Sequence, residues 1–485
     1  MLGFKGKPNW AKIWVAPTPL KHGGFKMHIR ASEEDGEPNK TGLDLFSLLS
    51  DELLVRILTK IPSNNQNPCS LVCKRWLKIH GQLVSHIKIH DWAFIESGRL
   101  ISRFPNLTDV DLVPACIKTP RNSGILITHD LIKTHLSSES TERFIRREDQ
   151  ISAESLDRGL EILSQGCPNL RKLSLIDIQR SFEDSGRSFS TIDSKLSEQN
   201  QSAIDTGLSK IASHCSMLQE LELHQCSDWS LRAISACRNL QILRLIGFID
   251  GFYDSAISDI GLTILAHGCK RLVRLELSGC EGSYDGICAI GKCCFMLEEL
   301  TICDHKMDEG WIAGLSFCSN LKTLRLVGCK RIDPNPGPTE HLGFCSALET
   351  LQLQHCNVRD KQSMSALFHV CGAVRELVFQ DCWGLDNEAF ALSSSCRRVK
   401  FLSLEGCSLL TTGGLESVVL MWKELQRLRV ISCNNIKDSE VTPALASLFS
   451  LLKELKWRPD TKSVLSNSLL GTGMGTKGGK FFKRA

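Results

Sequence analysis

The sequence predicts an α/β solenoid in which short strands alternate with helices. A frame L-x-x-L-x-L-x-x-C recurs along the chain, as in LQELELHQC at 218–226 and LKTLRLVGC at 321–329. From Leu297 onward its copies are spaced 24 to 27 residues apart. The stretches between copies have helical spacing, as Leu262 and Leu265 of GLTILAHGC show. Because one such unit cannot bury its apolar face alone, we expect stacked units that share one core.

Each copy predicts one short strand followed by a turn. The L-x-L alternation turns two apolar side chains inward and the residues between them outward. The period is that of a leucine-rich repeat, LRR. The lead apolar positions are 170, 218, 240, 272, 297, 321, 348, 374, 399, 425 and 452, with a divergent copy starting at Leu107.

The repeat also explains the cysteines, of which the chain has 22. Seven follow the predicted strands, at Cys226, Cys280, Cys329, Cys356, Cys382, Cys407 and Cys433. Nine lie three residues before a lead position, at Cys167, Cys215, Cys237, Cys269, Cys294, Cys318, Cys345, Cys371 and Cys396. A free cysteine packs as a small hydrophobe, so we expect reduced, mostly buried thiols. Zinc binding by the cluster at 280–303 is the rival interpretation, and because that cluster has no C-x-x-C pair we expect no metal site.

Composition limits the class of partner. The chain has 485 residues, 42% of them hydrophobic, and a net charge of +4. This balance does not predict a nucleic-acid partner. Lysines interrupt the N-terminal sequence, so no secretory signal is expected, and no run of 18 apolar residues predicts a membrane span. We therefore expect a protein of the nucleus and/or cytoplasm.

The sequence divides into four segments. We expect a disordered basic N-terminus at 1–42 and a helical module at 43–84. The solenoid follows at 85–458, with polar insertions near 113–150 and 177–203, and a flexible basic tail at 459–485. The loop CKRIDPNPGPTEHL at 329–342 has three prolines and should interrupt the usual helix of its repeat.

The module at 43–84 predicts a short helical hairpin. Ser50 is a suitable N-cap for the first helix and Pro62 ends it, while Pro68 suits the first turn of the next. Leu54 and Leu58 belong to an apolar stripe larger than so short a segment buries alone. The module is therefore either a cap for the solenoid or a docking module.

Two strings in this module, LSDELLVRIL at 49–58 and SLVCKRW at 70–76, resemble an F-box. Ser50 stands where that family usually has proline. The cysteine-bearing repeats resemble the cysteine-containing class of LRR, over about residues 156–458, and the layout is similar to uncharacterised plant F-box/LRR proteins. The resemblance implies an α/β fold: an N-terminal helical F-box followed by a curved LRR solenoid, the ribonuclease-inhibitor-like horseshoe.

The function implied by the resemblance is substrate recognition within an SCF-type (Skp–cullin–F-box) E3 ubiquitin ligase. The F-box would dock on the Skp adaptor, and through it on cullin and RING subunits, while the LRR arc holds a target protein for ubiquitination and degradation. The chain itself would be non-catalytic and without cofactors. Lys74 and Arg75 are expected to face solvent. Adaptor-binding positions implied by the family are Leu49, Ser50, Glu52, Leu53, Leu71, Val72 and Trp76.

The strand frame supplies candidate target-binding positions on the concave face. They are His224, Arg244, Glu276, Arg325, Gln352, Gln354, Arg429 and Lys456. Several are basic, which favours an acidic or phosphorylated target segment. The alternative is that exposed strand positions are simply polar.

Three other functions compete. The chain is a non-catalytic LRR interaction protein whose F-box-like segment acts only as a cap, or an inhibitor that binds an enzyme without an adaptor. An enzyme is disfavoured because the repeats consume nearly all candidate residues. The Walker A, H-E-x-x-H and G-x-S-x-G motifs are absent, and GMGTKG at 473–478 lies in the predicted tail without a flanking strand or helix.

Overall fold

The computed structural model describes residues 48–62, 66–117, 125–127, 150–177, 203–247, 257–305, 307–461 and 463. The chain forms two compact units, Met1–Ile151 and Ser152–Ala485. The predicted segment 1–42, most of both predicted insertions and the tail beyond 463 lie outside the described residues. Among the helices that the structure describes, none is long and apolar enough to cross a bilayer.

The first unit begins with helices and continues with short strands. Its elements are α1 (Asp51–Lys60), η4 (Asn67–Leu71), α2 (Lys74–Leu83), β1 (His86–Ile89), α3 (Ala93–Glu96), α4 (Arg99–Arg103), β2 (Asp109–Asp111), η5 (Val113–Cys116) and β3 (Ile125–Ile127). Strand β1 pairs with β2 in parallel and with β3 in antiparallel fashion. The copy expected at Leu107 is confirmed, because Leu107, Val110 and Leu112 are buried around β2.

The ends of the first predicted insertion are ordered. Val113 and Cys116 of η5 are buried, and Ile117 and Gln150 form an antiparallel bridge. The insertion 113–150 is therefore not uniformly a polar loop, since η5 continues the repeat that β2 begins and β3 adds a strand beside β1.

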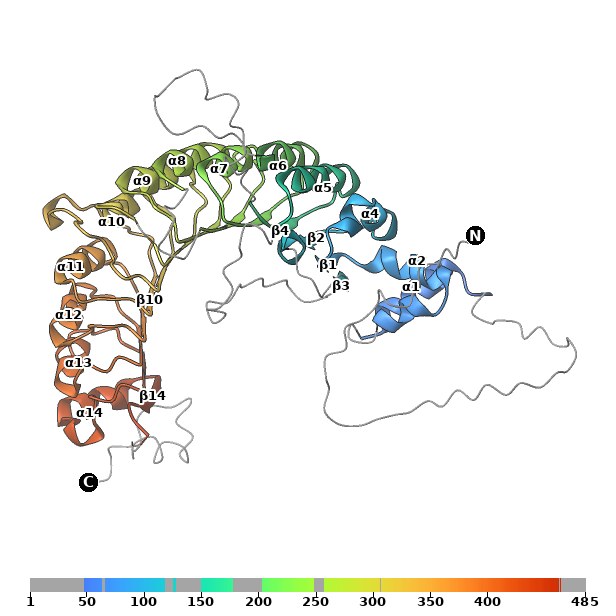
Figure 1. Ribbon diagram of the computed structural model, residues 1–485. Helices are drawn as coiled ribbons and strands as arrows, with labels where there is room; N and C mark the ends of the chain where they lie inside the picture. Colours follow the sequence, from blue (N-terminus) through green and yellow to red (C-terminus); the bar gives the residue numbers. More distant parts are fainter. Residues whose placement is uncertain are drawn as a thin grey trace, which may run out of the picture. The chain divides into compact units, whose positions relative to one another are not determined.

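The second unit is the repeated part of the chain (Figure 1). Each strand pairs in parallel with the next along the sequence. The strands are β4 (Lys172–Ile176), β5 (Glu220–His224), β6 (Ile242–Ile246), β7 (Arg274–Ser278), β8 (Glu299–Cys303), β9 (Thr323–Val327), β10 (Thr350–Gln354), β11 (Glu376–Gln380), β12 (Phe401–Glu405), β13 (Arg427–Ile431) and β14 (Glu454–Arg458).

Helices cover the outer side of this sheet (Figure 1). They are α5 (Ala153–Gly166), α6 (Ala203–His214), α7 (Asp228–Ile234), α8 (Asp259–Gly268), α9 (Tyr284–Cys293), α10 (Trp311–Gly314), η8 (Leu315–Phe317), η9 (Thr339–His341), α11 (Lys361–Val370), α12 (Asn387–Ala391), η10 (Leu392–Ser395), α13 (Thr412–Val419), η11 (Asp438–Glu440) and α14 (Pro443–Leu451). The second unit is therefore a solenoid of parallel strands and helices with the LRR arrangement.

The register confirms the sequence frame. Leu223 of β5 lies beside Leu245 of β6, which lies beside Leu277 of β7, and all three are fully buried. Leu262 and Leu265 of α8 close the same core from the helical side. The hydrophobic contact between neighbouring repeats, rather than within one repeat, therefore forms the core.

The repeat cysteines are buried free thiols, as expected. Cys294 donates to the carbonyl of Cys269 at 3.6 Å, and Cys269 donates to that of Ile234 at 3.4 Å. Burial raises the pKa of Cys294 to about 12, which keeps it a neutral donor. These positions call for a small apolar side chain with one weak donor, because carbonyls near the end of the preceding helix or 3-10 turn need a partner.

Neighbouring helices cap one another across the repeat boundary. The Asp259 carboxylate at the start of α8 accepts from the backbone N–H groups of Ser283 (2.7 Å) and Gly286 (2.8 Å) at the start of α9. A Cβ on Gly286 would come within 2.5 Å of that carboxylate, so only glycine permits the approach. The same arrangement joins Asp157 to Gly207, Asp228 to Ser258, and Asn387 to Thr411.

One repeat lacks its α-helix, as the prolines predicted. Between β9 and β10 the structure has only η9. The loop packs on α10 instead: Asp333 accepts from Gly310 N–H at 2.9 Å and Ile312 N–H at 3.1 Å, and Trp311 Nε1–H donates to the Ile332 carbonyl. The proline-rich loop thus serves as an N-terminal cap for the helix of the preceding repeat.

Two adjacent glycines of α13 test the cross-repeat cap. A Cβ at Gly414 would lie 2.0 Å from Asn387 Oδ1, whereas one at Gly413 meets nothing within 4 Å. We expect Gly414→Ala to lower the free energy of unfolding by about 1–3 kcal/mol, because Asn387 must leave Thr411. Gly413→Ala should be neutral or stabilising by up to about 1 kcal/mol. Urea denaturation of both variants measures this, and equal effects would contradict the cap.

His305 gives the solenoid an acid-sensitive position. Its ring lies edge-on to Trp311, Nδ1 accepts from Met307 N–H at 3.1 Å, and burial lowers its pKa to about 4. Between pH 6.5 and 4 the unfolded chain therefore binds more protons here than the folded one, so stability falls as the pH falls, by up to about 3 kcal/mol. Thermal unfolding of His305→Asn, which keeps an acceptor, should show a weaker loss between pH 7 and pH 5 than wild type.

Candidate functional site

Two surfaces hold the predicted site residues, and the first is the helical segment at 48–83. Its core consists of Leu54, Leu58, Cys69 and Ile79. Leu49 and Trp76, both predicted at the adaptor contact, pack against this core. These two side chains are therefore partly buried and mainly stabilise the helical segment, rather than being freely exposed to an adaptor.

Polar contacts fix the start of this segment. The Ser50 hydroxyl accepts from Leu53 N–H at 3.3 Å, which confirms Ser50 as the N-cap of α1. Asp51 and Glu52 occupy the first turn, where their negative charges interact favourably with the positive end of the helix dipole. Arg75 was expected to face solvent, but it forms an ion pair with Asp51 at 2.7 Å and donates to the Leu49 carbonyl. It ties α2 to the start of α1.

Part of the exposed surface of the helical segment is apolar. Leu53 is 46% exposed, Leu71 62% and Val72 61%, whereas Leu54, one residue along, is fully buried. We call the exposed set of Leu48, Leu53, Ile57, Leu71 and Val72 the apolar face. The apolar residues of α1 thus divide into a buried side, with Leu54 and Leu58, and an exposed side, with Leu53 and Ile57. Of the predicted adaptor-binding residues, Leu53, Leu71 and Val72 lie on the apolar face, and Ser50 and Glu52 are exposed at the N-terminus of α1.

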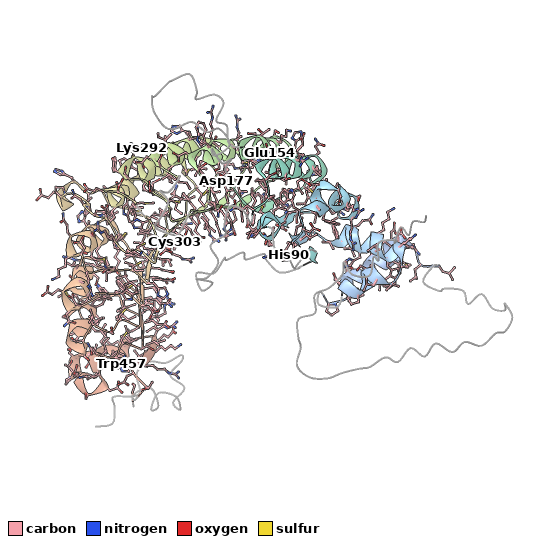
Figure 2. The ribbon with its side chains drawn as sticks, viewed as in Figure 1. His90, Glu154, Asp177, Lys292, Cys303 and Trp457 are labelled. Carbon is pink, nitrogen blue, oxygen red and sulfur yellow. The ribbon has the colours of Figure 1, made fainter. Side chains whose placement is uncertain are left out.

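The second surface is the inner face of β4–β14. The register places the third residue of each strand in one row, which we call the middle row. Six of the eight predicted target-binding residues belong to it, namely Arg244, Glu276, Arg325, Gln352, Arg429 and Lys456. Cys303 of β8 is labelled on the strand side in Figure 2, and Lys292 of α9 on the outer helical side.

The other two predicted residues, His224 and Gln354, lie in the row formed by the last residues of the strands. Gln354 is partly exposed, but His224 is only 2% exposed. Its Nε2 lies 3.0 Å from Oε1 of the buried Glu222. The prediction of His224 as a target contact is therefore wrong, because the side chain is enclosed and engaged within the protein.

Ion pairs cancel most of the positive charge on the inner face. Arg244 lies 3.3 Å from Glu276 and 3.6 Å from Glu222, and Arg429 lies 3.2 Å from Glu405. The basic residues that the sequence places on the inner face are therefore largely neutralised in this part of the structure. Two predicted cations have no acidic partner among the described residues, the half-buried Arg325 and the exposed Lys456.

Sequence reasoning named Glu276 but missed the other acidic partners, including Glu376, which pairs with Arg427. Glu222 and Glu405 lie on the strand next to the arginine that each neutralises. Glu376 lies two strands away from Arg427. The strand frame itself identifies them, since each is the first, third or last residue of its strand. What the sequence does not give is which side chains meet across the sheet.

Comparison with known proteins finds distant relatives. No protein-family model matches the chain. Coronatine-insensitive protein homolog 1a of Oryza sativa, in both the indica and japonica subspecies, is 27% identical over 183 residues. The match covers 36% of this chain and only 28% of the rice relatives' own length. The chain thus has weak homology to an F-box/LRR protein.

Solved structures with some likeness share little sequence with the chain. A Listeria monocytogenes internalin is 15% identical with a TM-score of 0.35, covering 66% of this chain and 88% of its own. A TLR13–ssRNA13 complex is 15% identical with a TM-score of 0.38, covering 73% and 39%. The yeast Rad7–Elc1 complex is 12% identical with a TM-score of 0.32, covering 83% and 94%. The LRR assignment rests on the strand register and the buried frame rather than on these likenesses.

Ser50 gives a test of how the helical segment begins. Ser50→Ala removes the acceptor for Leu53 N–H and should lower the free energy of unfolding of this segment by about 1 kcal/mol. Ser50→Asp keeps an acceptor and should retain wild-type stability. Hydrogen exchange of the α1 amides reports the change locally, and an unaltered exchange rate in Ser50→Ala would show that the hydroxyl does not cap the helix.

Proposed function

We propose that the protein is the substrate-recognition subunit of an SCF-type ubiquitin ligase. The observation that carries the proposal is the apolar face, on which Leu53, Leu71 and Val72 are between 46% and 62% exposed. Several large apolar side chains exposed on one small unit favour an interaction site. They occur within the two sequence strings that resemble an F-box, and the fold places them on one small helical unit with a packed core.

The comparisons support the general kind of protein only. Homology to a rice F-box/LRR protein extends over about a third of the chain. The repeats supply the second part of the proposal, because an LRR sheet presents many outward side chains along one face. We assign that face to a target protein that is to be ubiquitinated and degraded.

The proposed role requires no covalent chemistry from this chain. The helical segment would dock on a Skp adaptor, and through it on cullin and RING subunits. A target held on the inner face then meets the ubiquitin-loaded enzyme at a high effective concentration, which replaces a bimolecular encounter. In this role the protein is a non-catalytic receptor of the nucleus and/or cytoplasm that needs no cofactor.

The apolar face determines which variants test the proposal. Trp76 packs against the core, so truncating it damages the fold as well as any contact. Leu53→Asp combined with Leu71→Asp places charges on exposed positions and should leave folding intact. We expect this double variant to lose at least about tenfold in affinity for a purified Skp adaptor, since burying an unpaired carboxylate at an interface is costly.

A matched control is Met421→Asp combined with Leu451→Asp, which places the same two charges on apolar side chains of the second unit that are 61% and 80% exposed. It should bind the adaptor like wild type in co-purification and titration. Failure of the wild type itself to bind the adaptor would refute the ligase role and favour an LRR interaction protein whose helical segment is only a cap. Equal loss in the control would show that the effect is not specific to the apolar face.

A further inference from the structure

We propose that Arg325 on β9 is the anchor for a single carboxylate of the target, held between uncharged neighbours of the middle row. The proposal rests on the proposed function, because it assumes that the target lies along the inner face of the LRR sheet. It goes further by naming the chemistry of the recognised segment and the residue that reads it.

Arg325 differs from its neighbouring arginines on the inner face in having no acidic partner among the described residues. Arg274 donates to Glu299 at 3.0 Å and Arg427 lies 2.6 Å from Glu376, while Arg244 and Arg429 have the glutamate partners described above. Arg325 forms no ion pair with the described residues and lies between two neutral neighbours in the middle row, Thr301 and Gln352. A half-buried guanidinium without a counter-charge favours an anionic ligand.

The guanidinium of Arg325 is partly enclosed in the free protein. Nε of Arg325 is enclosed and has no hydrogen-bond acceptor. The terminal Nη groups form no hydrogen bond with the described residues. Two parallel N–H groups at the end of a guanidinium match the two oxygens of one carboxylate. Lys456, the other predicted cation without an acidic partner among the described residues, is exposed on β14 and is solvated.

Uncharged side chains lie beside Arg325 on the side where the strands end. The next row, formed by the last residues of the strands, presents Val327, Gln354 and Gln380 beside it. These side chains are partly exposed and carry no charge. Glutamine amides both donate and accept, so they suit the main chain of an extended peptide. The chemistry around Arg325 therefore fits a segment with one carboxylate and few other charges.

The spacing of cations excludes a ligand with several phosphates at this position. At roughly 4.8 Å between neighbouring strands, Arg325 lies about 14 Å from Arg244 and about 19 Å from Arg429 along the middle row. Both of those arginines are already paired with glutamates. A compact polyanion needs several free cations within a few ångströms, whereas one carboxylate needs only one guanidinium.

The test uses the full-length chain and arrays of short random peptides attached through their N-termini. Each peptide is made in three matched forms: with a free C-terminus, with a C-terminal amide, and as the amide with Asp and Glu replaced by Asn and Gln. We expect wild type to retain the first or second form at least about tenfold more strongly than the third. Preference for the first form alone identifies a terminal carboxylate, and equal preference for the first two identifies a side chain.

Arg325→Gln should remove this preference, and Arg325→Lys should weaken it because a lysine lacks the two-pronged donor. Arg427→Gln is the matched control, since that arginine is engaged by Glu376; it should keep the preference. Thermal unfolding should show that Arg325→Gln remains folded, as it breaks no ion pair.

Three results overturn the proposal: equal retention of the three forms by wild type, retention of no peptide by wild type, or an unchanged preference in Arg325→Gln. Adaptor co-purification separates these outcomes from the proposed function. An Arg325→Gln protein that binds adaptor normally but has lost the carboxylate preference supports both. A wild type that prefers carboxylates without binding adaptor refutes the ligase role and leaves the anchor intact.

Discussion

Burial of apolar side chains between neighbouring repeats is the constraint on which the rest of the second unit depends. Leu223, Leu245 and Leu277 follow one another across adjacent strands and exclude water completely. Because this core is continuous, each strand takes a fixed register with the next, and that register decides which outward side chains become neighbours. The candidate target surface is thus a by-product of the leucine positions, which themselves never contact a target.

The sequence predicted most of this core because its signals are local and periodic. The L-x-x-L-x-L frame and the buried cysteines appear where the spacing placed them. It missed β1, where Val84, Ile87 and Ile89 fill the frame with β-branched residues in place of leucine. It also extended the first insertion over η5, because the apolar stretch VPAC is too short to show a period of its own.

The surfaces were less predictable, because their properties arise between segments distant in sequence. Six of the eight predicted target-binding residues lie in the middle row, but the sequence did not show that Arg244 and Arg429 are neutralised by glutamates. Arg427 is neutralised by Glu376, two strands away, and His224 is enclosed beside Glu222. A strand frame gives the direction of each side chain but not its partner. The isolation of Arg325 therefore becomes visible only when every neighbouring strand is in place.

The caps that cross repeat boundaries have a consequence for how such a chain changes length. Asp259 serves the helix of the next repeat, and Asn387 serves a later one with the same hydrogen-bond geometry. These boundaries join an acceptor on one side to a Ser or Thr and a glycine on the other, so they are chemically alike. Deleting or duplicating one whole repeat recreates a working junction, whereas cutting within a repeat separates the two halves of a cap. Genetic gain and loss should accordingly proceed in whole units of this module.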